Sequence, residues 1–241
     1  MKKSRLFVIL FLIPFISCNT RSFRADIIVY GGTSAGVAAA VEASRLGLSV
    51  LLVGPDIHLG GLSASGLGWT DSGNKKVVGG LAREVYQRIK YQYDQSENWQ
   101  FENAEDSRYY KPDQDAVWVF EPHIAERVFE ELIREENITV HRDRWLDRKS
   151  GVKKENGKIS SIRMLNGDVY KGKMFIDASY EGDLMAAAGT SYTLGRESND
   201  QYGESINGVV TKRDISHQFE LDIDPYLTPG DPESGLLPRI H

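Results

Sequence analysis

The stretch Ala25–Gly61, which reads ADIIVYGGTSAGVAAAVEASRLGLSVLLVGPDIHLGG, decides the fold. The apolar residues 27–30 predict a short strand, the small residues that follow predict a helix as far as Leu46, and the apolar residues 49–53 predict a second strand. Between the first strand and the helix the chain turns at three glycines, Gly31, Gly32 and Gly36. This order predicts a β-α-β unit with a glycine turn at its first corner.

The glycine turn indicates a nucleotide site, because such a turn lets a diphosphate approach the backbone at the positive end of the helix. In the spacing Gly-x-Gly-x-x-Gly the first and third positions are Gly31 and Gly36, but the middle one is Thr33. An acidic residue usually holds the adenosine ribose at the end of the second strand. Here that position is Gly54, and Asp56 follows two residues later. From the turn alone, an ordinary strand-to-helix corner remains the alternative.

Residues 1–18 are typical of a targeting segment. A positive start precedes the apolar run Leu6–Phe15, which is too short to span a bilayer, and the segment ends in Ser17-Cys18. It resembles a bacterial lipoprotein signal, in which Cys18 is lipidated and becomes the new N-terminus; a plain secretory signal is the alternative. We therefore expect a lipid-anchored protein of the bacterial cell envelope, on the periplasmic face or the outer membrane, with residues 19–24 as a polar tether.

Composition excludes several classes of function. The 241 residues can bury one large core or slightly more, and 29 Lys plus Arg against 34 Asp plus Glu form no basic stripe for nucleic acid. Cys18 is the only cysteine, so a mature chain has no thiol for a disulfide, a metal ion or nucleophilic catalysis. We expect no metal site, and a small-molecule substrate and the membrane as partners, with the oligomeric state left open.

The segment Leu59–Leu81 holds seven glycines, which cannot all lie inside a helix because each costs about 1 kcal/mol relative to alanine. They indicate a backbone that passes close to another group, although a flexible surface loop is the alternative. Residues 82–90 then predict a short amphipathic helix, and residues 91–115 predict an irregular insertion over a substrate pocket. Four apolar residues predict that the glycine-rich loop is packed: Leu59, Leu62, Leu67 and Trp69.

The second half of the chain predicts further core elements. Residues 116–120 predict a strand, Pro122 opens an amphipathic helix that stops at Asn137, and residues 138–140 predict a third core strand with His141 at its solvated end. The dipeptides Asn156-Gly157 and Asn166-Gly167 predict two tight turns and hence a meander of three antiparallel strands. An apolar strand at 173–177 and a small helix at 184–188 follow.

With its parts in this order, the chain resembles the FAD-dependent oxidoreductases with the glutathione-reductase type of two-domain fold. It is most similar to the group whose corner reads Gly-Gly-Thr-x-Ala-Gly and whose loop reads His-Leu-Gly-Gly, over residues 25–190. The resemblance implies an α/β, Rossmann-like FAD/NAD(P)-binding three-layer fold with an antiparallel β-meander. The FAD-binding domain would comprise residues 25–90 and 116–190. Residues 191–241 would begin a substrate domain, and their many turn-forming residues lead us to expect an N-terminal fragment or a truncated product.

The resemblance also implies contacts with FAD. The corner residues 31–36 would hold the pyrophosphate, residues 58–61 would line its pyrophosphate and ribitol side, the loop 65–71 would approach the isoalloxazine, and Asp183 would contact the ribitol. Ser179-Tyr180 replaces the Thr-Gly that is usual in the family. The predicted cofactor-binding residues are Gly31, Gly32, Thr33, Ser34, Ala35, Gly36, Asp56, His58, Leu59, Gly60, Gly61, Gly66, Val140 (near the adenine), Ala178 and Asp183.

These expectations favour an exported, lipid-anchored FAD-dependent oxidoreductase that oxidises an unidentified small molecule, with sugar-derived molecules as one candidate class. His58 and Asp71 are the candidates for proton handling or for tuning the flavin ring, because both lie in the glycine-rich segment. Three alternatives are a surface lipoprotein that binds or cleaves polysaccharide, a nicotinamide-dependent enzyme, and a flavin fold that has lost its cofactor. A second Gly-x-Gly-x-x-Gly is absent, which disfavours a nicotinamide subdomain.

Overall fold

The computed structural model describes residues 20–71, 73–193 and 198–203. The chain divides into two compact units, residues 1–190 and residues 191–241. In the second unit the short helix α5 (Asn199–Tyr202) begins after Ser198, whose side chain accepts a hydrogen bond from the Asp200 N–H. The predicted lipidation site Cys18 and most of the predicted substrate domain lie outside the described residues.

A four-stranded parallel sheet forms the centre of the first unit. Its strands lie in the order β4-β3-β2-β8. Because all neighbours are parallel, Tyr30 pairs with both Val53 and Asp177 and the strands end at one common edge. The predicted β-α-β unit is therefore confirmed, and the strand predicted at 138–140 is shifted by one residue. The strand bounds are β2 (Ile27–Tyr30), β3 (Val50–Val53), β4 (Thr139–His141) and β8 (Met174–Asp177).

The predicted meander is confirmed as a second sheet, in the order β1-β7-β6-β5. Its first turn has Asn156 at φ 51° and Gly157 at φ 78°, the left-handed pair that a two-residue hairpin turn requires. The prediction of a tether over residues 19–24 is wrong for its last three residues, because they form β1 and pair in parallel with β7. The strand bounds are β1 (Ser22–Arg24), β5 (Val152–Glu155), β6 (Lys158–Arg163) and β7 (Val169–Lys171).

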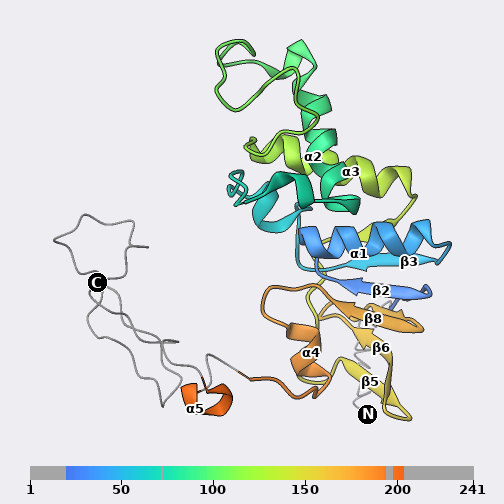
Figure 1. The fold of residues 1–241 in the computed structure, drawn as a ribbon. Coiled ribbons are helices and arrows are strands. Elements are labelled where there is room, and N and C mark those ends of the chain that lie inside the picture. Colours follow the sequence, from blue (N-terminus) through green and yellow to red (C-terminus); the bar gives the residue numbers. More distant parts are fainter. Residues whose placement is uncertain (1–19, 72, 194–197, 204–241) are drawn as a thin grey trace, which may run out of the picture. The chain divides into compact units, whose positions relative to one another are not determined.

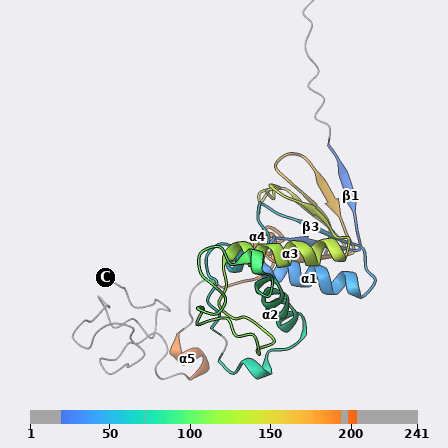
Figure 2. The ribbon, with the colours of Figure 1, turned by 90° about the horizontal axis from the view of Figure 1, so that it is seen from above.

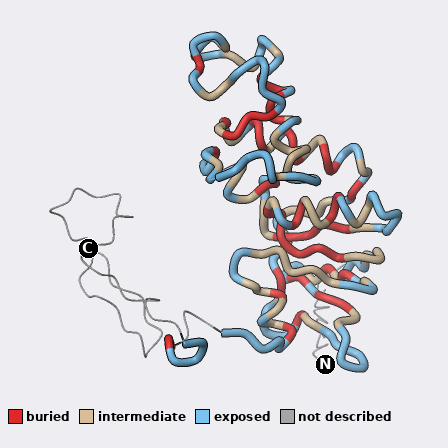
Figure 3. The backbone as a smooth tube through the Cα atoms, in the orientation of Figure 1, coloured by how far each residue is buried: buried red, intermediate tan, exposed pale blue. Residues whose placement is uncertain are grey.

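The first unit has three layers, with the parallel sheet between helices on one face and the meander on the other (Figures 1 and 2). Alternate strand residues face the two sides, so Val29 and Leu52 pack with the helices while Ile28 and Tyr30 pack with the meander. Figure 3 shows the buried residues concentrated between these layers. The helices are α1 (Ser34–Arg45), α2 (Gly80–Tyr93) and α3 (Pro122–Glu135) on one face and α4 (Asp183–Ala187) on the other.

Small side chains let α1 pack closely on the sheet. Gly36, Val37, Ala40 and Val41 are the buried residues of this helix, and none of them is large. Helix α3 follows its predicted pattern. Its apolar face is buried, and Pro122 lies in its first turn. After the helix the chain turns at Asn137, which has a φ of 53°. Helices α1 and α3 therefore both follow from local sequence pattern.

An ion-pair network joins α1, α2 and α3, the three helices on one face of the parallel sheet. Glu84 of α2 lies between Arg45 of α1, 2.8 Å away, and Arg88, also 2.8 Å away. Arg88 continues to Glu135 at 2.7 Å, and Arg45 continues to Glu136 at 3.0 Å. Several linked charges hold a geometry better than one exposed pair does, so the network fixes α2 against its neighbours.

Two predicted elements differ from the structure. Residues 116–118 and Phe120 are buried, but the segment 116–120 forms no regular strand among the described residues, where only Val119 pairs, with Trp69, in an isolated bridge. The helix predicted at 82–90 is longer, because α2 begins at Gly80 and continues to Tyr93. The prediction of an insertion from residue 91 therefore begins three residues too early.

The glycine-rich loop is only partly packed. Leu59 is buried as predicted, but Leu62, Leu67 and Trp69 are more than half exposed, so the prediction of a packed loop is wrong for these three. The loop carries two short 3-10 turns, η1 (Gly61–Ala64) and η2 (Lys75–Val77), and a third, η3 (Ser96–Asn98), follows α2. Across the described residues, every helix is too short or too polar to cross a bilayer.

Candidate functional site

The bend after β2 packs directly on the chain that leaves β8. Gly31 has a φ of 114°, and a Cβ atom on it would lie 2.6 Å from the Ala178 carbonyl carbon. A Cβ atom on Gly36 would overlap the Gly31 carbonyl oxygen. Side chains are therefore excluded at both ends of the glycine motif, as a close backbone approach requires.

Thr33, the departure from the glycine motif, caps α1. Its buried hydroxyl oxygen accepts a hydrogen bond from the Gly36 N–H at 3.2 Å and donates one to the Ala178 carbonyl oxygen at 2.8 Å. The first-turn N–H groups of Ser34 and Ala35 have no acceptor within the helix. These two groups and the positive end of α1 form a site for an anion such as a diphosphate.

Replacing Thr33 with valine should destabilise the domain by about 1 kcal/mol, because the cap and the bond to Ala178 are lost while the shape is kept. Thr33→Ser keeps the hydroxyl and should stay close to the wild type. Urea unfolding of the two variants measures the difference. Equal stability of both variants would contradict the capping role.

Asp56 occupies the place of the missing acidic residue. A Cβ atom on Gly54 would lie 2.9 Å from the Asp56 Oδ2, so the carboxylate fills the space beside that glycine. The same oxygen accepts a hydrogen bond from the Gly32 N–H at 2.7 Å. The Gly32 N–H therefore already donates to Asp56 and is not free to bind a diphosphate. What Gly32 contributes to the predicted site is the absence of a side chain, which lets a ligand come close to the backbone.

The loop residues 58–61 reach the bend as the resemblance implies. The Gly60 N–H donates to the Gly32 carbonyl oxygen at 2.9 Å, and Gly60 forms a parallel bridge with Thr33. A Cβ atom on Gly60 would overlap the ring of Phe129, so this glycine is held between the bend and α3. The loop thus extends the site along the bend.

Tyr180 crosses from the segment after β8 to this loop. Its hydroxyl oxygen accepts a hydrogen bond from the Leu62 N–H at 2.6 Å and lies so close to Gly61 that a Cβ atom there would overlap it. Tyr180 is 59% exposed, so this contact between the two segments lies at the protein surface. Sequence reasoning noted this residue only as a departure from Thr-Gly and missed its contact with the loop.

Asp177 organises the segment that ends at Asp183. The Asp177 carboxylate accepts hydrogen bonds from the Ser179 N–H, the Ser179 hydroxyl and the Met185 N–H at 2.7–3.0 Å. The Ser179 hydroxyl oxygen in turn accepts one from the Asp183 N–H at 3.0 Å, and the Asp183 carboxylate binds Arg148 at 3.1 Å. Sequence reasoning did not assign this role to Asp177, because it depends on a turn that no periodic pattern marks.

Three carboxylates act on the buried phenol of Tyr30. Burial raises the pKa of Tyr30 above its ordinary value, the hydrogen bond with the Leu146 N–H opposes this shift, and the charges of Asp183, Asp177 and Asp56 raise the pKa further. Asp183 and Asp56, predicted for the ribitol and ribose ends of the cofactor, therefore lie within electrostatic reach of one buried phenol.

The remaining predicted residues are more scattered. His58 points away to α3, where its Nδ1 lies 2.6 Å from a Glu126 carboxylate oxygen, and Asp71 is exposed. No contact joins these two candidates within the described part of the chain. The Val140 side chain packs against the helix-side core. Gly66 has a φ of 128° and open space around it.

Taken together, the residues fit an extended dinucleotide such as FAD. Positions 31, 36 and 60 admit no side chain, and two helix N–H groups remain for the diphosphate. The segments 58–62 and 178–183 both lie against this bend, where Gly60 contacts Gly32 and Thr33 contacts Ala178. Tyr180 is the one described side chain that bridges these two segments.

His141 is not a solvated strand end, so that prediction is wrong. Its Nδ1 lies 2.9 Å from the Tyr170 hydroxyl, and the ring of Phe23 packs edge-on at 4.4 Å. Burial lowers the pKa of His141, and the positive charges of Arg144 and Arg21 lower it further while Asp168 opposes them. The parallel sheet therefore ends against the meander and not in solvent.

The lowered pKa of His141 predicts acid sensitivity. The unfolded chain takes up the proton at higher pH than the folded one, so stability should be complete above a pH of about 6.5 and fall as the pH decreases below it. Thermal unfolding between pH 7.5 and 5.5 measures the loss. His141→Gln should flatten this dependence, whereas His123→Gln, at an exposed position, should leave it unchanged. A steep dependence that survives in His141→Gln would contradict the assignment.

Solved structures with a similar fold include a geranylgeranyl bacteriochlorophyll reductase-like protein from Thermoplasma acidophilum, with 20% identity and a TM-score of 0.47 over 73% of this chain and 45% of that one. L-proline dehydrogenase from P. horikoshii is 16% identical, with a TM-score of 0.48 over 73% of this chain and 59% of that one. The chain thus spans about half the length of the structures it matches. No curated protein matches it significantly.

The family comparison covers most of the chain. A family model described as FAD dependent oxidoreductase matches residues 26–229. This range contains the bend, the whole parallel sheet, the three antiparallel strands of the meander and the segment from Asp177 to Asp183. The chain therefore belongs to the FAD-dependent oxidoreductase family.

Proposed function

We propose that this chain binds FAD along the bend and that the complete protein uses the flavin to oxidise a small, sugar-derived molecule. The observation that supports cofactor binding most directly is the contact between the glycine bend and Ala178, which leaves room for backbone but not for side chains. The family to which the chain belongs supports the oxidoreductase class.

A bound flavin supplies a two-electron acceptor, and the residues of the chain supply binding and orientation. The N–H groups of Ser34 and Ala35 would hold the diphosphate, and the Asp56 carboxylate would lie at the ribose. The segments on either side of Tyr180 would exclude water from the ribitol side. His58 pairs with Glu126 on the protein surface and Asp71 is exposed, so we propose no proton transfer for either residue.

The visible spectrum of the purified full-length chain tests cofactor binding. We expect flavin absorption bands, release of FAD on denaturation, and recovery of the bands when the stripped protein is dialysed against FAD. A colourless protein that takes up no FAD would contradict the proposal and indicate a flavin fold without its cofactor. Polysaccharide binding by a protein that takes up no FAD would favour the lectin or lyase alternative.

Anaerobic bleaching of the bound flavin tests the substrate class. Aldoses and sugar alcohols should bleach the flavin, whereas amino acids should not. If only amino acids bleach it, the sugar-derived substrate is wrong while FAD binding stands. The flavin content, measured first, keeps the two conclusions separate.

We also propose that Cys18 carries a lipid that holds the protein at the cell envelope. The apolar run before Cys18 and its position after Ser17 support this. In cells given a fatty acid that can be labelled, the wild type should incorporate label and sediment with membranes, and Cys18→Ser should do neither. Label in the Cys18→Ser protein would contradict lipidation at this residue.

A further inference from the structure

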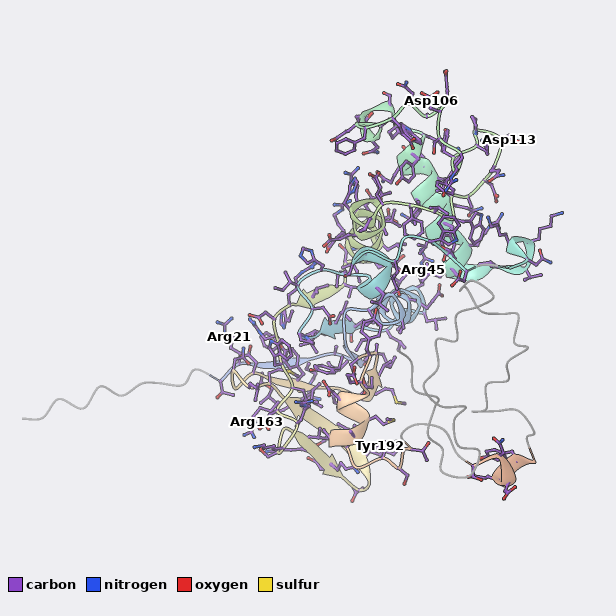
Figure 4. All side chains as sticks on the ribbon, turned by 90° about the vertical axis from the view of Figure 1, so that its left-hand side faces the viewer. Arg21, Arg45, Asp106, Asp113, Arg163 and Tyr192 are labelled. Carbon is purple, nitrogen blue, oxygen red and sulfur yellow. The ribbon has the colours of Figure 1, made fainter. Side chains whose placement is uncertain are left out.

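A cavity of about 400 Å³ lies at the far end of the helix layer, between the end of α2, the insertion and residues 117–123. This volume is within the range of small-molecule sites, roughly 300–1,000 Å³. None of the residues predicted to hold FAD lines it. In Figure 4 the labelled Asp106 and Asp113 mark the insertion, at the opposite end of the unit from Arg163 of the meander.

The aromatic wall of the cavity is held in place by hydrogen bonds. The Trp99 Nε1–H donates to the Tyr93 carbonyl oxygen at 2.7 Å, and the Trp99 ring packs against the rings of Tyr93 and Tyr110, each with its centre 5.2 Å away. The Tyr110 hydroxyl donates to Asp94 at 2.7 Å. Phe101 lines the cavity and is 92% exposed. These contacts therefore fix the rings of Trp99 and Tyr110, whereas the Phe101 ring is exposed to solvent.

The polar wall contains hydrogen-bonding groups that nothing else uses. Gln100, Glu102 and His123 line the cavity, and in the described part of the chain their side chains form no hydrogen bond or ion pair. Glu121 is partly used, because one carboxylate oxygen accepts from the Tyr93 hydroxyl at 3.1 Å. An amide, an imidazole and two carboxylates together provide both donors and acceptors.

The charges around the cavity disfavour both an anionic and a cationic ligand. No Lys or Arg lines the cavity, and the charged groups that an anion would meet there are the carboxylates of Glu102 and Glu121. A cation would find the tyrosine faces already taken, because Arg108 lies over the ring of Tyr109 at 4.5 Å and Lys90 over that of Tyr110 at 4.8 Å. The carboxylate of Glu102 is exposed, so solvent screens its attraction for a cation.

We propose that this cavity binds a neutral sugar ring. The C–H face of a pyranose would pack on Phe101 and Trp99, and its hydroxyl groups, each a donor and an acceptor, would bind Gln100, Glu102 and His123. The site does not require bound flavin, so this inference does not rest on the proposed function. It has a connection to the loop predicted to approach the isoalloxazine, because Val119 of the cavity wall pairs with Trp69 of that loop.

Titration calorimetry of the full-length chain with D-glucose, D-galactose, D-mannose and maltose tests the proposal, with choline as the cationic probe and D-glucuronate as the anionic one. At least one neutral sugar should bind, and neither charged probe should. Absence of binding by all four neutral sugars, or binding of choline in their place, would overturn the proposal. The flavin content of the sample is measured separately, so failure to bind FAD and failure to bind sugar are distinguishable.

Variants locate the binding in the cavity. Phe101→Ala should weaken the sugar about tenfold, because a ring face is lost. Leu165→Ala, a change at an exposed apolar residue of the meander hairpin, should have no effect. Glu102→Gln keeps an oxygen acceptor and should retain the sugar within about threefold, whereas a cationic ligand would be lost. Unchanged sugar binding in Phe101→Ala, whose folding is checked by thermal unfolding, would place the sugar elsewhere and overturn the assignment.

Discussion

Replacing Gly36 with alanine should lower FAD affinity about a hundredfold, equivalent to about 2.7 kcal/mol. Alanine is the better helix former by about 1 kcal/mol, so helix propensity alone would stabilise the variant. The new Cβ atom would instead overlap the Gly31 carbonyl oxygen and approach Ala178 to 3.2 Å. Because the obstacle is backbone, the bend itself must move. We expect an overpacking cost of about 3 kcal/mol and a melting temperature about 10 °C lower.

Gly79→Ala is the matched control for this substitution. Gly79 precedes α2, its φ is not in the left-handed region, and a Cβ atom there would meet nothing within 4 Å. Fluorescence titration with FAD and thermal unfolding of both variants separate crowding at the bend from the general loss of a glycine. If both bind FAD equally, the bend does not approach the cofactor as we describe.

Removing the Asp177 carboxylate is the second change with a large expected effect. Asp177→Ala leaves the Ser179 and Met185 N–H groups without their acceptor, and hydrogen bonds to a charged group contribute about 1.5–3 kcal/mol each. We expect a loss of about 3 kcal/mol of stability and weaker FAD binding, because the chain that carries Asp183 is no longer fixed.

Urea unfolding and FAD titration measure these two effects of Asp177→Ala. Asp113→Ala removes an exposed carboxylate from the insertion, labelled in Figure 4, and should change neither quantity. Asp177→Asn should lie between the wild type and alanine, since one amide oxygen remains to accept from Ser179. A stable Asp177→Ala protein with wild-type FAD affinity would show that α4 is positioned by packing alone.

Local signals predicted most of the fold correctly. The glycine bend, α1 and the two Asn-Gly turns were predicted because each depends on neighbouring residues. These signals are the glycine spacing at residues 31–36, the small side chains on one helix face, and the Asn-Gly dipeptides. The face of α3 followed from its period. Together these fix the β-α-β unit and the meander, and hence the three layers.

What the sequence did not predict depends on contacts between distant segments. Strand β1 has three residues and no apolar period, and it exists because β7, more than a hundred residues later, offers an edge. The other unpredicted features also depend on segments that are distant in the chain. They are the contact of Tyr180 with Leu62, the contact of His141 with Tyr170, and the cavity beside Trp99. Periodicity and turn chemistry carry no information on such pairs.

The pairing of β1 limits the reach of the proposed lipid anchor. Only three residues separate Cys18 from Ser22, the first residue of β1, so even a fully extended chain spans about 14 Å. A lipid on Cys18 would therefore hold the meander edge against the phospholipid head groups. This edge carries the exposed Arg24 and the exposed Arg21, which is labelled in Figure 4. The protein would then diffuse in two dimensions with its bilayer, and a dissolved donor would have to reach it by travelling to the membrane surface.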